Sequence, residues 1–167
     1  MTEHPAQPDI AQAPPHAKTN GIPEQPWYAA YPKAHSEPAT ISRQELLRLL
    51  KSDTGPGETF VLVDLRRTDY EGGTIMGSIN LPAQSLHPTI PSLYSLFEAA
   101  GVNQVIWYCG SSRGRGNRAA AWFADYISEQ NNTDMRSLVL ADGIKGWAAE
   151  GGEFVQYMQE YDASKWE

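Results

Sequence analysis

The chain has 167 residues, of which 41% are hydrophobic and 20% are charged, and its formal net charge is −7 at pH 7. This length and composition predict one soluble globular domain, and the acidic balance argues against general binding to nucleic acid. The single cysteine excludes an intramolecular disulfide, argues against a cysteine-based metal site and is typical of a reducing compartment. Because the sequence has neither an apolar run of about 18 residues nor a signal-peptide pattern, we expect a cytoplasmic or nuclear protein that does not enter a membrane.

The first part of the chain differs in composition from the rest. Residues 1–26 combine prolines with small and polar residues, and such a segment buries too little apolar surface to fold. We therefore expect residues 1–26 to be a disordered tail and residues 27–167 to form one domain, with its core at about 40–150. Three aromatic residues that follow the tail are expected to pack on the domain as an aromatic strap: Trp27, Tyr28 and Tyr31.

The domain opens with a helix and a buried strand. Ser42 and Glu45 have the spacing of a capping box, and the leucines after them form the apolar face of a short helix. Phe60 to Leu65 is an apolar run interrupted only by Asp64, which is the pattern of a strand buried on both faces of a parallel sheet. We expect Asp64 to form a structural hydrogen bond or ion pair rather than to act as a catalytic acid.

Strands and helices alternate through the rest of the domain. We expect a helix from Pro91 to Ala100, a strand from Gln104 to Tyr108, a helix that ends near Glu129 and a strand from Ser137 to Ala141. The last residues, which are rich in aromatic side chains, are expected to close over the core. This alternation predicts an α/β fold with a mainly parallel sheet, in which ligands bind beyond the carboxyl ends of the strands.

The only cysteine lies where the central strand is expected to end. Cys109 precedes a loop of Gly, Ser and Arg residues and then an Ala-rich helix. A strand, a loop of small residues and a helix N-terminus direct backbone N–H groups at an anion. The helix dipole and the neighbouring arginines are expected to lower the pKa of a thiol at this position. Cys109 is therefore a candidate nucleophile.

The spacing between this cysteine and a following arginine predicts a cup for an oxyanion. Five residues separate Cys109 from Arg115, and this length allows the loop to curl around the sulfur with its amides pointing inward. The guanidinium of Arg115 has a planar fork that matches two oxygens of a tetrahedral oxyanion. The expected anion-binding residues are Gly110, Ser111, Ser112, Arg113, Gly114 and Arg115.

Three segments, taken in order, resemble the rhodanese-like domain superfamily. The first is residues 63–82, which contain Val-Asp-Leu-Arg and then Tyr-Glu-Gly-Gly-Thr-Ile-Met-Gly-Ser-Ile-Asn-Leu-Pro. The second is the loop after Cys109, and the third is residues 142–147, Asp-Gly-Ile-Lys-Gly-Trp. The resemblance covers about residues 40–150 and implies a three-layer domain, in which helices flank a central, mainly parallel sheet.

The active loop is one residue longer than is typical of the sulfurtransferases in this superfamily. In this it resembles the M-phase inducer phosphatases and the eukaryotic arsenate reductases related to them. That resemblance implies a phosphatase of the protein tyrosine or dual-specificity type, in which Cys109 forms a phosphocysteine and Arg115 stabilises the transition state. The alternative is arsenate reduction with glutathione and glutaredoxin as external reductants. A thiosulfate-type sulfurtransferase and a non-catalytic phosphate-binding module are less favoured, and none of these readings requires a bound metal or cofactor.

The loop also departs from the phosphatase pattern. Those phosphatases carry acidic residues in the loop, whereas none lies between Cys109 and Arg118, so a loop carboxyl group cannot protonate the leaving group. Asp142 is the one candidate general acid, although a turn or helix-cap role is favoured for it. Because no specificity insert is visible, we expect a shallow, open site that accepts a phosphorylated protein or a small oxyanion.

Overall fold

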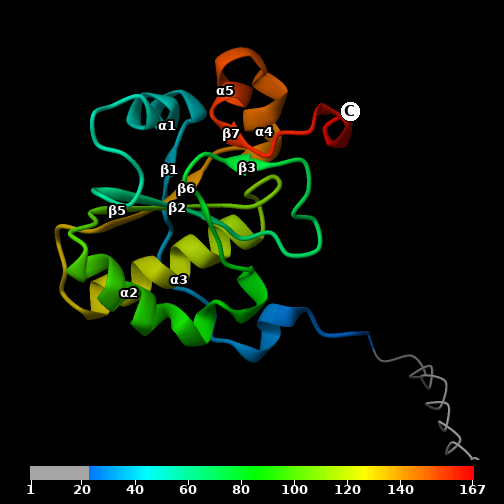
Figure 1. Ribbon diagram of the computed structural model, residues 1–167. Helices are drawn as coiled ribbons and strands as arrows, with labels where there is room; N and C mark the ends of the chain where they lie inside the picture. Colours follow the sequence, from blue (N-terminus) through cyan, green and yellow to red (C-terminus); the bar gives the residue numbers. More distant parts are fainter. Residues whose placement is uncertain (1–22) are drawn as a thin grey trace, which may run out of the picture.

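The computed structural model describes residues 23–167, so residues 1–22 of the predicted tail lie outside the described residues. A five-stranded sheet, in which all neighbouring strands are parallel, crosses the centre of the molecule (Figure 1). Its strands in spatial order are β1 (Ala39–Ile41), β6 (Arg136–Leu140), β5 (Gln104–Tyr108), β2 (Phe60–Asp64) and β4 (Ile79–Asn80). A separate antiparallel pair joins β3 (Thr74–Ile75) to β7 (Met158–Gln159).

Helices cover both faces of the sheet (Figure 1). On one face lie α1 (Arg43–Leu50), α4 (Gly143–Glu150) and α5 (Gly152–Gln156), and on the other lie α2 (Ile90–Ala99) and α3 (Arg115–Glu129). Short 3-10 helices are η1 (Trp27–Ala30), η2 (Ala83–Ser85), η3 (His87–Thr89) and η4 (Ala163–Lys165). Within residues 23–167, no helix is long and apolar enough to cross a bilayer. The arrangement confirms the predicted three-layer α/β fold.

Each face of the sheet packs against its own core. Val63 and Trp107 belong to the core on the side of α2 and α3, and their neighbours Leu62 and Ile106 belong to the core on the side of α1 and α4. Successive residues of a strand point to opposite faces, so a strand that contributes to both cores needs an almost continuous apolar sequence. This explains the composition of β2 and β5, the two strands that the sequence marks most clearly.

Two local predictions near the start of the domain are confirmed. α1 begins with the capping box, because the Glu45 amide donates to Ser42 Oγ and the Ser42 amide donates to the Glu45 carboxylate. The aromatic strap packs on α3, where Trp27 and Tyr31 each meet the Trp122 ring edge to face, with ring centroids 6.0 and 5.8 Å apart. The strap thereby covers the part of α3 that follows the active loop.

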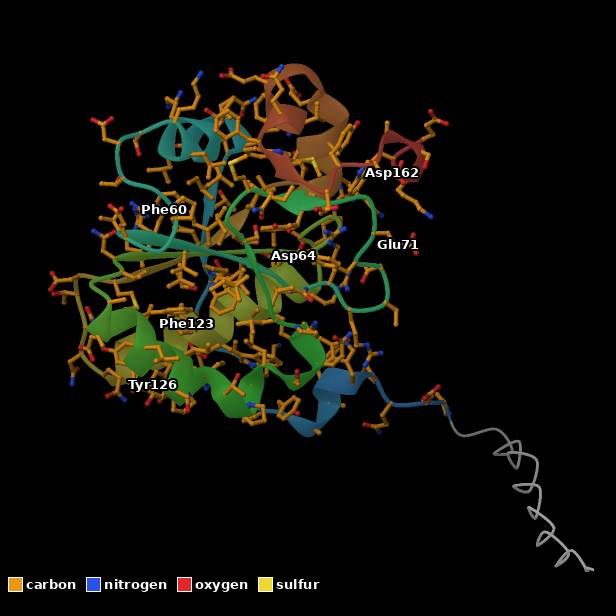
Figure 2. All side chains as sticks on the ribbon, viewed as in Figure 1. Phe60, Asp64, Glu71, Phe123, Tyr126 and Asp162 are labelled. Carbon is orange, nitrogen blue, oxygen red and sulfur yellow. The ribbon has the colours of Figure 1, made fainter. Side chains whose placement is uncertain are left out.

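The parallel strands bring several loops to one edge of the sheet. Asp64, at the end of β2, lies opposite Tyr108, at the end of β5, so the loops after these strands leave the sheet side by side. The turn into α4 leaves β6, which is the other neighbour of β5. Figure 2 shows Asp64 at this edge and Glu71 in the loop beyond it. The edge is the place where ligands bind in sheets of this kind.

Candidate active site

Cys109 and Ser112 hold each other at the base of the loop. Cys109 directly follows β5 and is only 3% exposed. The Ser112 amide donates to Cys109 Sγ at 3.2 Å, and the Cys109 amide donates to Ser112 Oγ at 3.3 Å. Ser112 has a left-handed backbone, with φ of 60°, which turns the chain back over the sulfur. A donor at this distance stabilises the negative charge that returns to the sulfur when a covalent intermediate breaks.

Other amides of the loop are available to an anion. Within the part of the chain that the structure describes, the amides of Gly110, Ser111 and Gly114 donate to no protein acceptor. α3 begins at Arg115, so the N–H groups of its first turn, which have no partner inside the helix, lie beside the same loop. The predicted cup for a tetrahedral oxyanion requires donors in this arrangement.

The start of α4 supports the loop from behind. The Ile144 amide donates to the Cys109 carbonyl at 3.1 Å, and the Lys145 amide donates to the Gly110 carbonyl at 3.0 Å. Gly143 has φ of 58° and approaches so closely that a β-carbon there would collide with both carbonyl oxygens. Glycine at this position therefore allows the start of α4 to contact the loop. This explains why residues 142–147, the third segment that resembles the superfamily, carry a glycine at position 143.

Arg115 is bound to Asp69, a residue that the sequence analysis did not single out. The two terminal nitrogens of Arg115 donate to the two carboxylate oxygens of Asp69 at 2.8 and 2.6 Å. The bonds from Arg115 lower the pKa of Asp69 to about 2, and the bonds to Asp69, followed by the charge on nearby Cys109, raise the pKa of Arg115. In the sequence, the one sign of this pair is that the loop after β2, the strand next to β5, contains an acidic residue at position 69. Arg115 is thus held beside the sulfur before any substrate arrives.

A buried ion pair shapes the loop that carries Asp69. Arg66 is 2% exposed, and it donates to the carboxylate of fully buried Asp64, with a closest contact of 2.7 Å. The remaining Arg66 donors include bonds to the carbonyls of Glu71 and Gly73 at 3.0 and 2.7 Å. Asp64 therefore has the structural role that was predicted for it, and it acts on the site through the loop after β2.

Two predicted site residues have neighbours other than the Arg115–Asp69 pair. The Arg113 side chain is exposed and lines a hollow of about 520 Å³, together with residues of the aromatic strap. We call it the second hollow, to distinguish it from the larger pocket beside Gly110. The Asp142 carboxylate pairs with Arg43 of α1 at 3.3 Å, and it makes no side-chain cap at the start of α4. This ion pair links Asp142 to α1. The left-handed backbone of Asp142, with φ of 62°, places it in the turn at the N-cap position of α4, in agreement with the turn role, whereas its role as the general acid stays a prediction.

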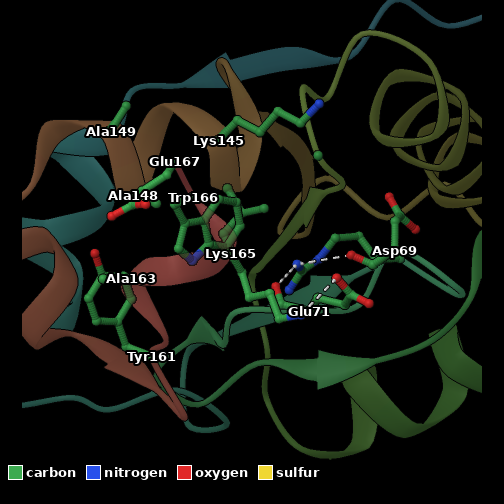
Figure 3. A pocket seen from close by; sticks show the side chains of 13 residues that line it. Asp69, Glu71, Lys145, Ala148, Ala149, Tyr161, Ala163, Lys165, Trp166 and Glu167 are labelled. Carbon is green, nitrogen blue, oxygen red and sulfur yellow. Dashed lines mark hydrogen bonds and ion pairs between the residues drawn. The ribbon is translucent and has the colours of Figure 1, made fainter.

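A pocket opens beside Gly110, where a shallow surface was expected (Figure 3). It has a volume of about 780 Å³ and extends from the active loop and α4 to the C-terminal segment, residues 161–167. The indole N–H of Trp166 donates to the Gly72 carbonyl at 2.9 Å, which fixes this segment as one wall. The charged lining residues are Arg66, Asp69, Glu71, Lys145, Lys165 and Glu167. The active loop is therefore flanked by a pocket that the sequence analysis did not predict.

The comparison with protein families agrees with this architecture. The model of the rhodanese-like domain matches residues 42–150, which is more than half of the chain. The chain belongs to the rhodanese-like domain family. This rhodanese-like domain is 30% identical over 114 residues to Arsenical-resistance protein 2 of Saccharomyces cerevisiae, with 64% of this chain and 85% of the relative covered.

Two solved structures resemble the rhodanese-like domain in fold. A yeast protein tyrosine phosphatase of the rhodanese family matches with a TM-score of 0.67 and 24% identity, over 80% of this chain and 100% of the other. The As-Sb reductase from Leishmania major matches with a TM-score of 0.62 and 24% identity, over 70% of this chain and 80% of the other. At these identities the likeness shows a shared fold, and the fold is one that enzymes use.

Proposed function

We propose that this rhodanese-like domain reduces arsenate, with Cys109 as the nucleophile and glutathione as the external electron donor. The observation that carries the proposal is the Cys109 sulfur in a loop with free amides, where the carboxylates in the loops after β2 and β6 have cationic partners. These pairs are Asp69 with Arg115, Glu71 with Lys165, and Asp142 with Arg43. The relative at 30% identity, which is named for arsenical resistance, supports the same reaction.

Because these carboxylates are ion-paired, a phosphate ester and arsenate differ in where the proton for the leaving oxygen can come from. An alkoxide or phenoxide that leaves phosphorus needs a positioned acid to protonate it. Asp69 is ionised in its bond to Arg115, with a pKa of about 2, and does not supply that proton at neutral pH. Arsenate carries its own acidic hydroxyl groups, so the proton for its leaving oxygen comes from the substrate or from solvent in the open pocket.

The first step is attack of the Cys109 thiolate on arsenic. A sulfur–arsenic bond forms, one arsenic–oxygen bond breaks, and the oxygen leaves as water after protonation. Arg115 and the free loop amides stabilise the negative charge on the other oxygens. This step explains why the chain places one cysteine and one bidentate arginine at the same anion site.

Two thiols then complete the cycle. A glutathione thiolate attacks the Cys109 sulfur, the sulfur–arsenic bond breaks with its electron pair going to arsenic, and arsenite leaves. Cys109 remains as a mixed disulfide with glutathione, which a second glutathione or glutaredoxin resolves to release the thiolate. Two thiols are thus oxidised to one disulfide for each arsenate that is reduced. The single cysteine of the chain is the reason that both electron donors are external.

Phosphomonoester hydrolysis is the second candidate function. It is favoured by the five-residue spacing from Cys109 to Arg115 and by the hydrogen bond from the Ser112 amide to Sγ. That bond would help the thiolate to leave when water hydrolyses a phosphocysteine. The substrate would be a phosphorylated protein or a small phosphate ester.

A paired assay on the purified protein tests the proposal. Arsenite release in the presence of glutathione and glutaredoxin is measured beside the hydrolysis of a small aryl phosphate. We expect reduction to dominate, Cys109→Ser to abolish it, and Arg115→Ala to lower turnover by about 10²–10³-fold. Phosphate release without arsenate reduction would replace the proposal with the phosphatase, and the absence of both reactions would reject an enzyme of either kind.

A further inference from the structure

The space above Gly110 lies between two cationic side chains. A β-carbon placed on Gly110 would be 3.9 Å from the Lys145 ammonium nitrogen and 3.9 Å from a terminal nitrogen of Arg115. Arg115 is bound by Asp69. Among residues 23–167, in contrast, no acidic group pairs with Lys145. An uncompensated cation therefore lies next to the residue that follows the nucleophile.

The pocket beside Gly110 extends away from this point. Lys145 lines the pocket and Arg115 does not, so Lys145 is available to a ligand there while Arg115 serves the oxyanion cup. Figure 3 shows Lys145 on the α4 side of the pocket and Lys165 close to Glu71 on the opposite wall. The contact between Lys165 and Glu71 is 3.9 Å long, and both side chains are about half exposed. Both groups are thus accessible to a ligand.

The volume of the pocket indicates a ligand larger than an oxyanion. At about 780 Å³ the pocket is in the range of sites that hold ligands of several hundred daltons, whereas a tetrahedral oxyanion occupies only the cup around Cys109. The walls combine apolar groups, such as Trp166 and Tyr161, with charged groups of both signs. Such a lining is suited to a short zwitterionic peptide.

We propose that this pocket binds the thiol co-substrate, an anionic peptide thiol of the glutathione class, and that Lys145 holds one of its carboxylates. The inference rests on the proposed function, which requires an external thiol to reach the Cys109 sulfur. A γ-glutamyl tripeptide carries two carboxylates and one ammonium group, and the pocket offers Lys145 and Lys165 to the first and Glu71 to the second. Its thiol approaches the loop past Gly110, which has no side chain to obstruct it.

Oxidised glutathione probes the pocket without arsenate. The Cys109 thiolate attacks one sulfur of the reagent, a bond forms between Cys109 and one glutathionyl group, and the other glutathione leaves as a thiolate. Mass spectrometry of the full-length protein gives the second-order rate constant. The same measurement with hydroxyethyl disulfide, which has a similar reactive bond and no charged group, provides the reference. The ratio of the two rate constants reports recognition of the peptide, because changes in the reactivity of Cys109 cancel.

We expect the wild-type protein to prefer oxidised glutathione and Lys145→Gln to lower the ratio by about tenfold, since the substitution removes the charged donor that binds a carboxylate of the peptide. Lys165→Gln should lower the ratio by about threefold, because Glu71 already offsets part of the Lys165 charge. The matched control is Lys33→Gln, which removes an exposed lysine that lines the second hollow and not the pocket beside Gly110. This substitution should leave the ratio unchanged.

The outcomes separate this inference from the proposed function. No preference in the wild-type protein, or a preference that Lys145→Gln retains, overturns the pocket assignment even if arsenate is reduced. A preference that Lys145→Gln loses supports the pocket assignment, and if arsenate reduction is absent in the paired assay, only the proposed reaction is rejected.

Discussion

Asp69 and an incoming oxyanion compete for the same guanidinium. Because Asp69 occupies both terminal nitrogens of Arg115, a substrate must displace the carboxylate or share its donors. We predict that Asp69→Asn binds inorganic phosphate or arsenate about threefold to tenfold more tightly, since the competing charge is removed. We expect its kcat to fall about tenfold, because Arg115 is no longer fixed beside the sulfur. Calorimetry and steady-state kinetics measure the two effects, and unchanged values for both would contradict the competition.

The same ion pair predicts how stability changes with acid. The folded pKa of Asp69, about 2, is below its ordinary value of 3.8, so the folded protein binds this proton less readily than the unfolded chain does. The stabilising contribution is therefore complete above about pH 4 and is lost as the pH falls through about 2. Urea titrations should show a modest excess in the free energy of unfolding of the wild-type protein over Asp69→Asn near neutral pH. A difference that does not shrink as the pH falls from about 4 towards 2 would contradict this assignment.

The buried pair of Asp64 and Arg66 predicts a larger effect on stability. Asp64→Ala leaves the guanidinium of Arg66 buried without its carboxylate, and breaking a buried pair in this way costs about 3–5 kcal/mol. The free energy of unfolding from urea titrations measures the loss. The matched control is Asp134→Ala, which removes an exposed carboxylate and should change stability by no more than about 0.5 kcal/mol. Equal effects of the two substitutions would show that the buried pair is not needed.

These residues also show what a sequence can reveal about a site. Asp64 could be predicted as structural because it is a lone polar residue in an apolar strand, and such a residue needs a partner. Cys109 and Arg115 could be predicted because their chemistry depends on a spacing within one loop. The bond between Arg115 and Asp69 joins the first residue of α3 to the loop after β2, which are far apart in the chain, and no local pattern encodes such a contact.

At the scale of elements, the contact between α4 and the active loop should be sensitive to a single methyl group. Gly143 and Gly101 both have positive φ, but a β-carbon collides with two carbonyl oxygens at Gly143 and meets nothing within 4 Å at Gly101. We expect Gly101→Ala to cost about 1–2 kcal/mol from backbone strain alone. Gly143→Ala should cost more and lower turnover about 10²-fold, because it displaces the loop.

Urea titrations and turnover assays on both variants check this prediction. Comparing Gly143→Ala with Gly101→Ala separates the effect of the collision at Gly143 from backbone strain, since both positions have a left-handed backbone. Equal losses of activity in Gly143→Ala and Gly101→Ala would mean that α4 does not control the position of the loop.

The order of elements could be predicted from periodicity, and the C-terminal wall of the pocket could not. The strand, loop and helix around Cys109 each carry a local signal, namely an apolar run, small residues and an Ala-rich segment. The position of residues 161–167 depends instead on a hydrogen bond from Trp166 to the Gly72 carbonyl. The aromatic content of this segment predicted that it would close over the core, but not that it would form one side of a pocket.

For the molecule as a whole, the shared central strands predict cooperative unfolding. β2 and β5 contribute to both cores, with Trp107 in one and Trp147 in the other, so neither core can open without disturbing the strands that hold the second. We expect a single transition in urea, with coincident curves from far-UV circular dichroism and tryptophan fluorescence. Two separated transitions would show that the layers unfold independently.

The outermost strands of the sheet are also its shortest. β1 has 3 residues and β4 has 2, so each edge of the sheet presents only a few unpaired backbone groups. A neighbouring molecule that added a strand at either edge would gain few hydrogen bonds, and short edge strands are one way in which proteins avoid such pairing. Concentrated solutions of the folded protein should therefore resist the growth of fibrils, and any fibrils that form under stress should arise from chains that have first unfolded.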